Sequence, residues 1–179
     1  SLPHQPPDTP GDRLQQLGRE VLLVRDPGTT RIGEQIRQIL LNPDHTDMGM
    51  REFTGLARGM YGRGPAPLAR VRENDTLAIR QALDNGAMGV IVPLVNSADE
   101  AERAVAAAKY PPRGVRGSAF IRANDYGVRY QEYAASANDD VLVMVMIESK
   151  QSVENIDSIV AVDGVDGVCF QSSTPLATD

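Results

Sequence analysis

The chain has 179 residues, of which 41% are hydrophobic and 23% are charged, with a formal net charge of −6. This length favours one globular domain, and no apolar run is long enough to span a bilayer, so we expect no membrane insertion. The negative charge would repel phosphate backbones, which argues against a general nucleic-acid-binding role but still allows small anionic substrates.

The N-terminal residues predict a flexible arm. Residues 1–12 contain four prolines and little apolar content, a composition unlike that of a secretory signal. We therefore expect a cytoplasmic protein in which residues 13–179 form a single domain.

Short apolar runs alternate with helical patterns along the rest of the chain. The predicted strands are 21–24, 39–41, 67–71, 89–95, 141–147 and 165–170. The run 141–147 has no polar alternation, which is typical of a parallel strand covered on both faces, although a core helix is the competing interpretation. Its valine content and the polar residues 137–140 before it favour the strand.

Three helices are predicted between these strands. One begins near Asp75 and ends at the Asn-Gly pair of residues 85–86. A second follows Ser97, which with Glu100 has the spacing of a capping box. A third begins near Ser152 and carries an apolar stripe along residues 153–160. The alternation of strands and helices predicts an α/β fold.

Cys169 is the single cysteine of the chain. A lone cysteine excludes an internal disulfide, and its apolar neighbours favour a packed strand residue over a nucleophile.

Arg70 lies inside the apolar strand pattern 67–71. An unpaired guanidinium would be costly to bury there. A bound anion would remove that cost, and so would a structural salt bridge inside the fold. Arg70 is therefore a candidate anion-binding residue.

Three more polar residues stand where strands or helices are predicted to end. Glu148 follows the strand 141–147, where a parallel barrel presents functional side chains; a carboxylate that caps the next helix is the alternative. His45 follows the strand 39–41, and histidine suits proton transfer near neutral pH; an exposed loop histidine is the alternative. Asp84 precedes the Asn-Gly pair, so ordinary turn chemistry would also explain it.

Seven ordered motifs between residues 67 and 170 resemble those of the HpcH/HpaI aldolase and citrate-lyase family. They lie at residues 68–71, 82–87, 89–95, 110–117, 122–127, 147–149 and 164–168. Each is weak alone, but their order and spacing agree. The resemblance implies a TIM (β/α)₈ barrel and a metal-dependent lyase that makes or breaks a carbon–carbon bond next to a pyruvate-type enolate.

The resemblance also implies roles for single residues. Arg70 would hold the substrate carboxylate or oxo group and stabilise the enolate charge. Glu148 would bind a divalent metal ion, Mg²⁺, Mn²⁺ or Co²⁺, that polarises a 2-oxo acid. His45 would act as the base through a water molecule, and Asp84 would pair with it. The arginine-containing loop 109–127 would be ordered, with Arg116 at the site.

Two segments depart from the family pattern. The family's second metal carboxylate lies in a Gly-Pro-x-Asp-Leu motif, where this chain has Thr174 at the acid position. A neutral hydroxyl is a poor ligand for a hard cation, so we expect weakened metal affinity. Beside His45, Asn42 and Asp44 replace the family's Asp and Glu.

The visible pattern is an incomplete barrel. It has about six strands and is about two βα units short of the roughly 250 residues typical of this fold. Strands from a partner, residues removed from the chain, or another packing solution would each explain this. An open sheet edge invites pairing, so we expect a homo-oligomer.

Two functions from different classes remain. The first, which we prefer, is a lyase acting on a 2-oxo acid or a related 3-hydroxy acid. The second is a degenerate family member that performs metal-independent decarboxylation or rearrangement, or serves as a non-catalytic binding or assembly subunit. The altered residues 171–174 are the main support for the second.

Overall fold

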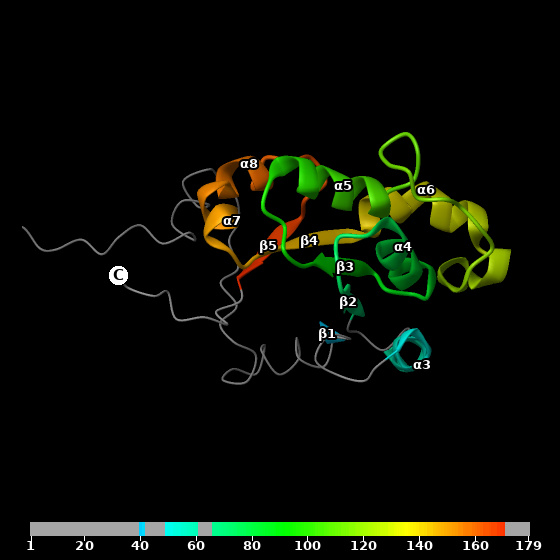
Figure 1. Ribbon diagram of the computed structural model, residues 1–179. Coiled ribbons are helices and arrows are strands. Elements are labelled where there is room, and N and C mark those ends of the chain that lie inside the picture. Colours follow the sequence, from blue (N-terminus) through cyan, green and yellow to red (C-terminus); the bar gives the residue numbers. More distant parts are fainter. Residues whose placement is uncertain (1–39, 42–48, 61–65, 171–179) are drawn as a thin grey trace, which may run out of the picture. The chain divides into compact units, whose positions relative to one another are not determined.

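The computed structural model describes residues 40–41, 49–60 and 66–170 (Figure 1). The predicted N-terminal arm, the predicted strand 21–24, His45 and Thr174 lie outside these residues. No helix in the described ranges has the length and apolar character needed to cross a membrane.

The core of the fold is a parallel sheet whose strand order follows the chain order. Its strands are β1 (Leu40–Leu41), β2 (Leu68–Arg70), β3 (Gly89–Val92), β4 (Leu142–Ile147) and β5 (Gly167–Phe170). Each lies within a predicted strand. Sequential parallel strands joined by helices are the arrangement of a (β/α)₈ barrel, of which these residues form a part.

Helices lie between the strands. They are α3 (Met50–Met60), α4 (Thr76–Asp84), α5 (Ala98–Ala108), the 3₁₀ helix η1 (Arg122–Gly127), α6 (Tyr130–Asp140), α7 (Lys150–Glu154) and α8 (Ile156–Val160). The sequence patterns did not predict α3 or α6. Residues 137–140, interpreted as a polar lead-in to a strand, are the last turn of α6.

Two of the predicted helix starts are confirmed by their caps. The Asp75 side chain accepts a hydrogen bond from the backbone N–H of Ala78 at 2.8 Å and begins α4. The Ser97 hydroxyl accepts one from the N–H of Glu100 at 3.3 Å and begins α5, whereas the Glu100 carboxylate accepts from the N–H of Asn96, one residue before the predicted capping-box partner. Each cap satisfies a backbone donor that has no partner within its helix.

The third predicted helix is wrong as a single element. It is divided at Asn155 into α7 and α8, and Val153 is 38% exposed instead of joining the buried stripe of Ile156 and Val160. Asn155 leaves the helical backbone geometry, and its side-chain amide donates to the backbone carbonyl of Asn96 at 2.8 Å. This long-range bond explains the break.

Alternate side chains of the central strands point to opposite faces of the sheet. Val90, Val92, Val143 and Val145 are fully buried, and α4 and α5 pack against β3 and β4. Figure 1 shows α5 and α8 along one side of the sheet. Met146, on the opposite face of β4, is also buried. The prediction that 141–147 is a strand is therefore confirmed, but its second face is only partly covered, because Leu142 is 39% exposed and Met144 is half-buried.

Candidate active site at the strand ends

Arg70 and Glu148 lie at the same edge of the sheet. Arg70 is the last residue of β2, and Glu148 follows β4 directly. Because carboxyl ends of parallel strands share an edge, these side chains come close: Nη2 of Arg70 is 3.8 Å from Oε1 of Glu148. The two side chains are only 9% and 11% exposed. Burial lowers the local dielectric, so charges at this edge act more strongly than at the surface.

The second oxygen of Glu148 is held by the loop after β3. The backbone N–H of Leu94 donates to Oε2 of Glu148 at 2.9 Å. Leu94 has a positive φ of 54°, so the chain turns there and β3 ends at Val92, earlier than the predicted 89–95. Nothing in the sequence marks this donor, because it is a backbone group that any residue carries.

Cys169 faces the same region from β5. Burial raises the pKa of its thiol, and the charge of Glu148 raises it further. The thiol therefore stays protonated, which supports its interpretation as a packing residue, since the thiolate is the reactive form.

Asp84 lies at the other end of the sheet. It is the last residue of α4, and a helix that follows a strand in a βα unit runs back toward the start of the next strand. The described residues therefore do not bring Asp84 to Arg70 and Glu148 within one chain. Its partner there is Arg116, with Nη2 of Arg116 2.9 Å from Oδ1 of Asp84.

Arg116 is an internal residue of the loop between α5 and η1. Its side chain is fully buried, and its guanidinium carbon lies 4.7 Å from the ring centre of Tyr110 and 5.8 Å from that of Tyr133. Burial lowers the pKa of Arg116, but Tyr133, Asp84 and Tyr110 outweigh this effect and the net shift is upward. For the neutral phenol of Tyr110 burial acts in the opposite direction and raises the pKa to about 12. Arg116 thus joins the loop to α4 and α6.

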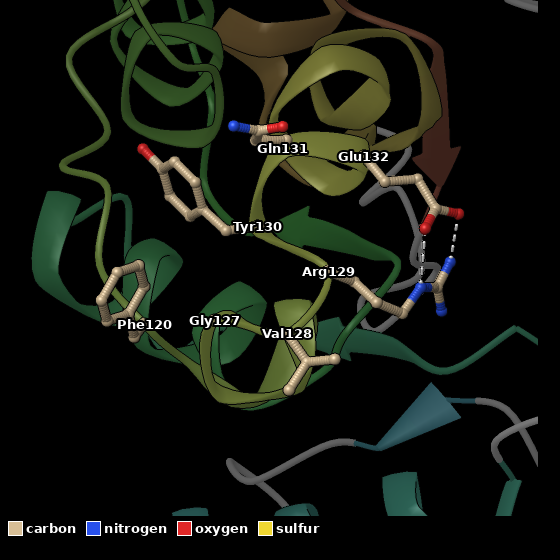
Figure 2. A pocket seen from close by; sticks show the side chains of 7 residues that line it. All are labelled: Phe120, Gly127, Val128, Arg129, Tyr130, Gln131 and Glu132. Carbon is tan, nitrogen blue, oxygen red and sulfur yellow. Dashed lines mark hydrogen bonds and ion pairs between the residues drawn. The ribbon is translucent and has the colours of Figure 1, made fainter.

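A shallow hollow of about 500 Å³ lies beside the start of α6. Its lining residues are Phe120, Gly127, Val128, Arg129, Tyr130, Gln131 and Glu132 (Figure 2). Arg129 and Glu132 form an ion pair of 2.6 Å on its rim. The hollow is not lined by Arg70 or Glu148, so it is separate from the strand-end site.

Glu148 fits the role of one metal ligand. Each oxygen of an ionised carboxylate has more than one lone pair, so the bonds to Leu94 and Arg70 leave acceptor capacity. Proteins commonly hold Mg²⁺ with one or two carboxylates and complete the shell with water and substrate. No cluster of three or more His, Cys, Asp or Glu side chains within the described ranges has the arrangement of a metal site.

The family assignment rests on the fold, the strand-end pair and comparison with known proteins. The profile of the HpcH/HpaI aldolase/citrate lyase family matches residues 54–174. This chain belongs to that family.

Among individual relatives, the chain is 37% identical over 131 residues to 5-keto-4-deoxy-D-glucarate aldolase of Escherichia coli O139:H28 (strain E24377A / ETEC). That alignment covers 73% of this chain and 51% of the relative, so the chain spans about half the length of the curated relatives it matches.

Two solved structures share the fold. The HpcH/HpaI aldolase from Desulfitobacterium hafniense DCB-2 has a TM-score of 0.70 and 32% identity, covering 89% of this chain and 64% of that one. An HpcH/HpaI aldolase/citrate lyase family protein from Burkholderia cenocepacia J2315 has a TM-score of 0.69 and 29% identity, covering 73% and 53%. The predicted TIM-barrel class is thereby confirmed.

Proposed function

We propose that the protein is a carbon–carbon lyase of the aldolase type that acts on a 2-oxo acid through its enolate. The observation that carries this proposal is the buried pair of Arg70 and Glu148 at the carboxyl ends of β2 and β4. The chemistry of TIM barrels takes place at that edge. The similarity to a 5-keto-4-deoxy-D-glucarate aldolase supports the reaction class.

The guanidinium of Arg70 suits the anionic groups of such a reaction. In retro-aldol cleavage a base removes the hydroxyl proton, that carbon becomes a carbonyl, and the electrons of the broken carbon–carbon bond pass into the enolate. The planar N–H fork of Arg70 would bind the substrate carboxylate or the growing enolate charge. A divalent ion bound at Glu148, Mg²⁺, Mn²⁺ or Co²⁺, would supply Lewis-acid polarisation of the ketone.

Proton transfer is assigned to His45 in this proposal. An imidazole suits it because its charge changes near neutral pH, so it can take the hydroxyl proton directly or through water. The family resemblance assigns Asp84 to pair with this histidine, and in the described residues Oδ1 of Asp84 pairs with Nη2 of Arg116. We therefore propose that Asp84 acts through that pair and the loop it holds.

A second candidate function follows from Thr174. With a hydroxyl at the family's second acid position, metal affinity would fall, and metal-independent decarboxylation, rearrangement or a binding role would remain.

Calorimetry with Mn²⁺ and oxalate, a mimic of the pyruvate enolate, separates the two candidates. The lyase proposal expects oxalate to bind in the presence of Mn²⁺, and pyruvate to be released from a 4-hydroxy-2-oxo acid. Absence of both results in the folded protein would reject the lyase in favour of the metal-independent function.

Thr174→Asp should strengthen binding of Mg²⁺ or Mn²⁺. If Thr174 occupies the position of the family's second carboxylate, the substitution adds a negative oxygen ligand beside Glu148, and affinity for hard cations rises with ligand charge. We expect a gain of about tenfold, equivalent to ~1.4 kcal/mol. Titration calorimetry of the parent and the variant measures it, and an unchanged or lower affinity would show that Thr174 does not occupy that position.

We also propose that the protein is a homo-oligomer and that the loop 118–128 forms part of its interface. Phe120, Tyr126 and Val128 are 73%, 65% and 87% exposed. Such a cluster of exposed apolar side chains is characteristic of an interaction site.

The loop that carries this cluster is ordered. Buried Asn124 holds it through hydrogen bonds to the backbone of residues 119, 121 and 127. Figure 2 shows Phe120 and Val128 on the hollow, whose rim carries both charge signs. Mixed charges around an apolar centre suit a second copy of the same surface.

Sedimentation at micromolar concentration tests this proposal. We expect a dimer or larger assembly for the parent and a shift toward monomer for Phe120→Ser with Val128→Ser, because the apolar contact is lost. Leu77→Ser, at another exposed apolar position on α4, is the matched control and should leave the assembly unchanged. A stable parent monomer, or equal effects of the variants and the control, would contradict the proposal.

A further inference from the structure

Asn96 links the loop after β3 to the loop after β4. All four of its polar groups have partners from other residues. Its backbone N–H donates to Oε2 of Glu100 at 2.6 Å, and its backbone carbonyl accepts from the side-chain amide of Asn155 at 2.8 Å. Its side-chain N–H donates to the carbonyl of Leu94 at 2.9 Å, and its side-chain oxygen accepts from the hydroxyl of Ser149.

The backbone bonds of Asn96 have a local explanation. The bond to Glu100 ties residue 96 to the first turn of α5, and the bond from Asn155 holds residue 96 to the junction of α7 and α8. Any residue at position 96 offers the same N–H and carbonyl. The two side-chain bonds need a group that donates on one side and accepts on the other, which the amide of asparagine provides.

The first side-chain bond holds the turn at Leu94. A positive φ of 54° is unfavourable for a residue with a branched side chain, and surrounding contacts must maintain it. The side-chain amide of Asn96 donates a hydrogen bond to the carbonyl of Leu94, two residues earlier in the chain. Held in this way, the Leu94 N–H points at Oε2 of Glu148.

The second side-chain bond holds the neighbour of Glu148. Ser149 caps α7, and its hydroxyl also contacts the side chain of Asn96. One amide thus fixes both the backbone donor at Leu94 and the chain segment that carries the acceptor Glu148. The residues joined are far apart in sequence, since Ser149 lies 53 positions after Asn96.

We propose that Asn96 is a positioning residue that sets the orientation of the Glu148 carboxylate. This inference rests on the proposed function of Glu148 as a metal ligand beside Arg70. With Asn96 in place, Leu94 restrains Oε2, and the carboxylate keeps one orientation at the strand ends. Without the amide the turn relaxes, Oε2 loses its donor, and Glu148 samples orientations that bind a cation less well.

The sharpest variant is Asn96→Asp, which keeps the shape of the side chain and the acceptor for Ser149 but loses the donor to Leu94. Asn138→Asp is the matched control. The Asn138 side chain also both donates to and accepts from the backbone of one residue, Tyr110, at 3.0 and 2.7 Å, but it lies on α6 away from Glu148. Both variants place a carboxylate where an amide bonded to backbone.

Two measurements on the full chain distinguish positioning from general stability. Calorimetry with Mn²⁺ should show an affinity loss of about 10–100-fold for Asn96→Asp, the range seen when a residue that supports a metal ligand is changed, and little change for Asn138→Asp. Amide hydrogen exchange should show the Leu94 N–H protected in the parent and in Asn138→Asp, but exchanging at least about tenfold faster in Asn96→Asp and in Glu148→Ala.

The outcomes also separate this inference from the proposed function. If the parent binds no Mn²⁺ and releases no pyruvate, the lyase proposal fails, and exchange at Leu94 alone decides whether Asn96 positions Glu148. Unchanged exchange in Asn96→Asp would overturn the inference, and so would equal losses of Mn²⁺ affinity in the Asn96 and Asn138 variants.

Discussion

Arg70→Ala should lower kcat/KM for cleavage by about 10²–10³-fold, the size of effect expected when a buried donor to a developing oxyanion is removed. The variant should also bind oxalate far more weakly than the parent. Arg70→Lys should fail as well, because a single ammonium cannot reproduce the two parallel N–H groups that meet a carboxylate. Steady-state kinetics and calorimetry with oxalate measure both effects.

Arg113→Ala is the control for Arg70. Arg113 pairs with Asp139 at 2.8 Å, both side chains are exposed, and neither belongs to the strand-end site. Its loss should leave oxalate binding and turnover near the parent values. If Arg70→Ala binds oxalate as tightly as the parent, the assignment of Arg70 is wrong. The circular dichroism spectra of Arg70→Ala and the parent must match, which shows that the variant is folded. This check is needed because Arg70 also neutralises the charge of buried Glu148.

Arg116→Ala should lower the free energy of unfolding by ~3 kcal/mol, because removal of one partner leaves the other charge of a buried pair uncompensated. The partner, Asp84, is 20% exposed, which places the loss at the lower end of the usual range. The contacts of the guanidinium with the rings of Tyr110 and Tyr133 are lost as well. Urea unfolding followed by circular dichroism measures the change.

Arg113→Ala is also the control for Arg116→Ala, because Arg113 and Arg116 lie in the same loop. The exposed pair of Arg113 with Asp139 should contribute about 1 kcal/mol or less. Similar unfolding free energies for the two variants would mean that Arg116 does not hold the loop against α4. The comparison needs equal m-values, because a changed denatured state would alter both numbers.

The amino-acid sequence by itself determined the α/β class, the strand positions and the family. The unbroken apolar run 141–147 predicted β4 correctly, because its short length and valine content favour a strand over a core helix. Asp75 and Ser97 marked true helix starts, because capping depends on residues within one turn of each other. Arg70 inside the apolar run 67–71 and Glu148 directly after the run 141–147 were singled out by those positions and by the family resemblance, and the shared edge of parallel strands brings the two side chains together.

Tertiary structure decided the features that depend on distant contacts. The helix α6 buries Ala137 as its one buried residue, so its sequence has no strong apolar stripe to reveal it. The partner of Asp84 lies 32 positions later at Arg116, and the backbone donor for Glu148 lies 54 positions earlier at Leu94. Local patterns report on neighbours within a turn of helix or a few strand residues, whereas these bonds form only after the strands have paired and the loops at each end of the sheet have met.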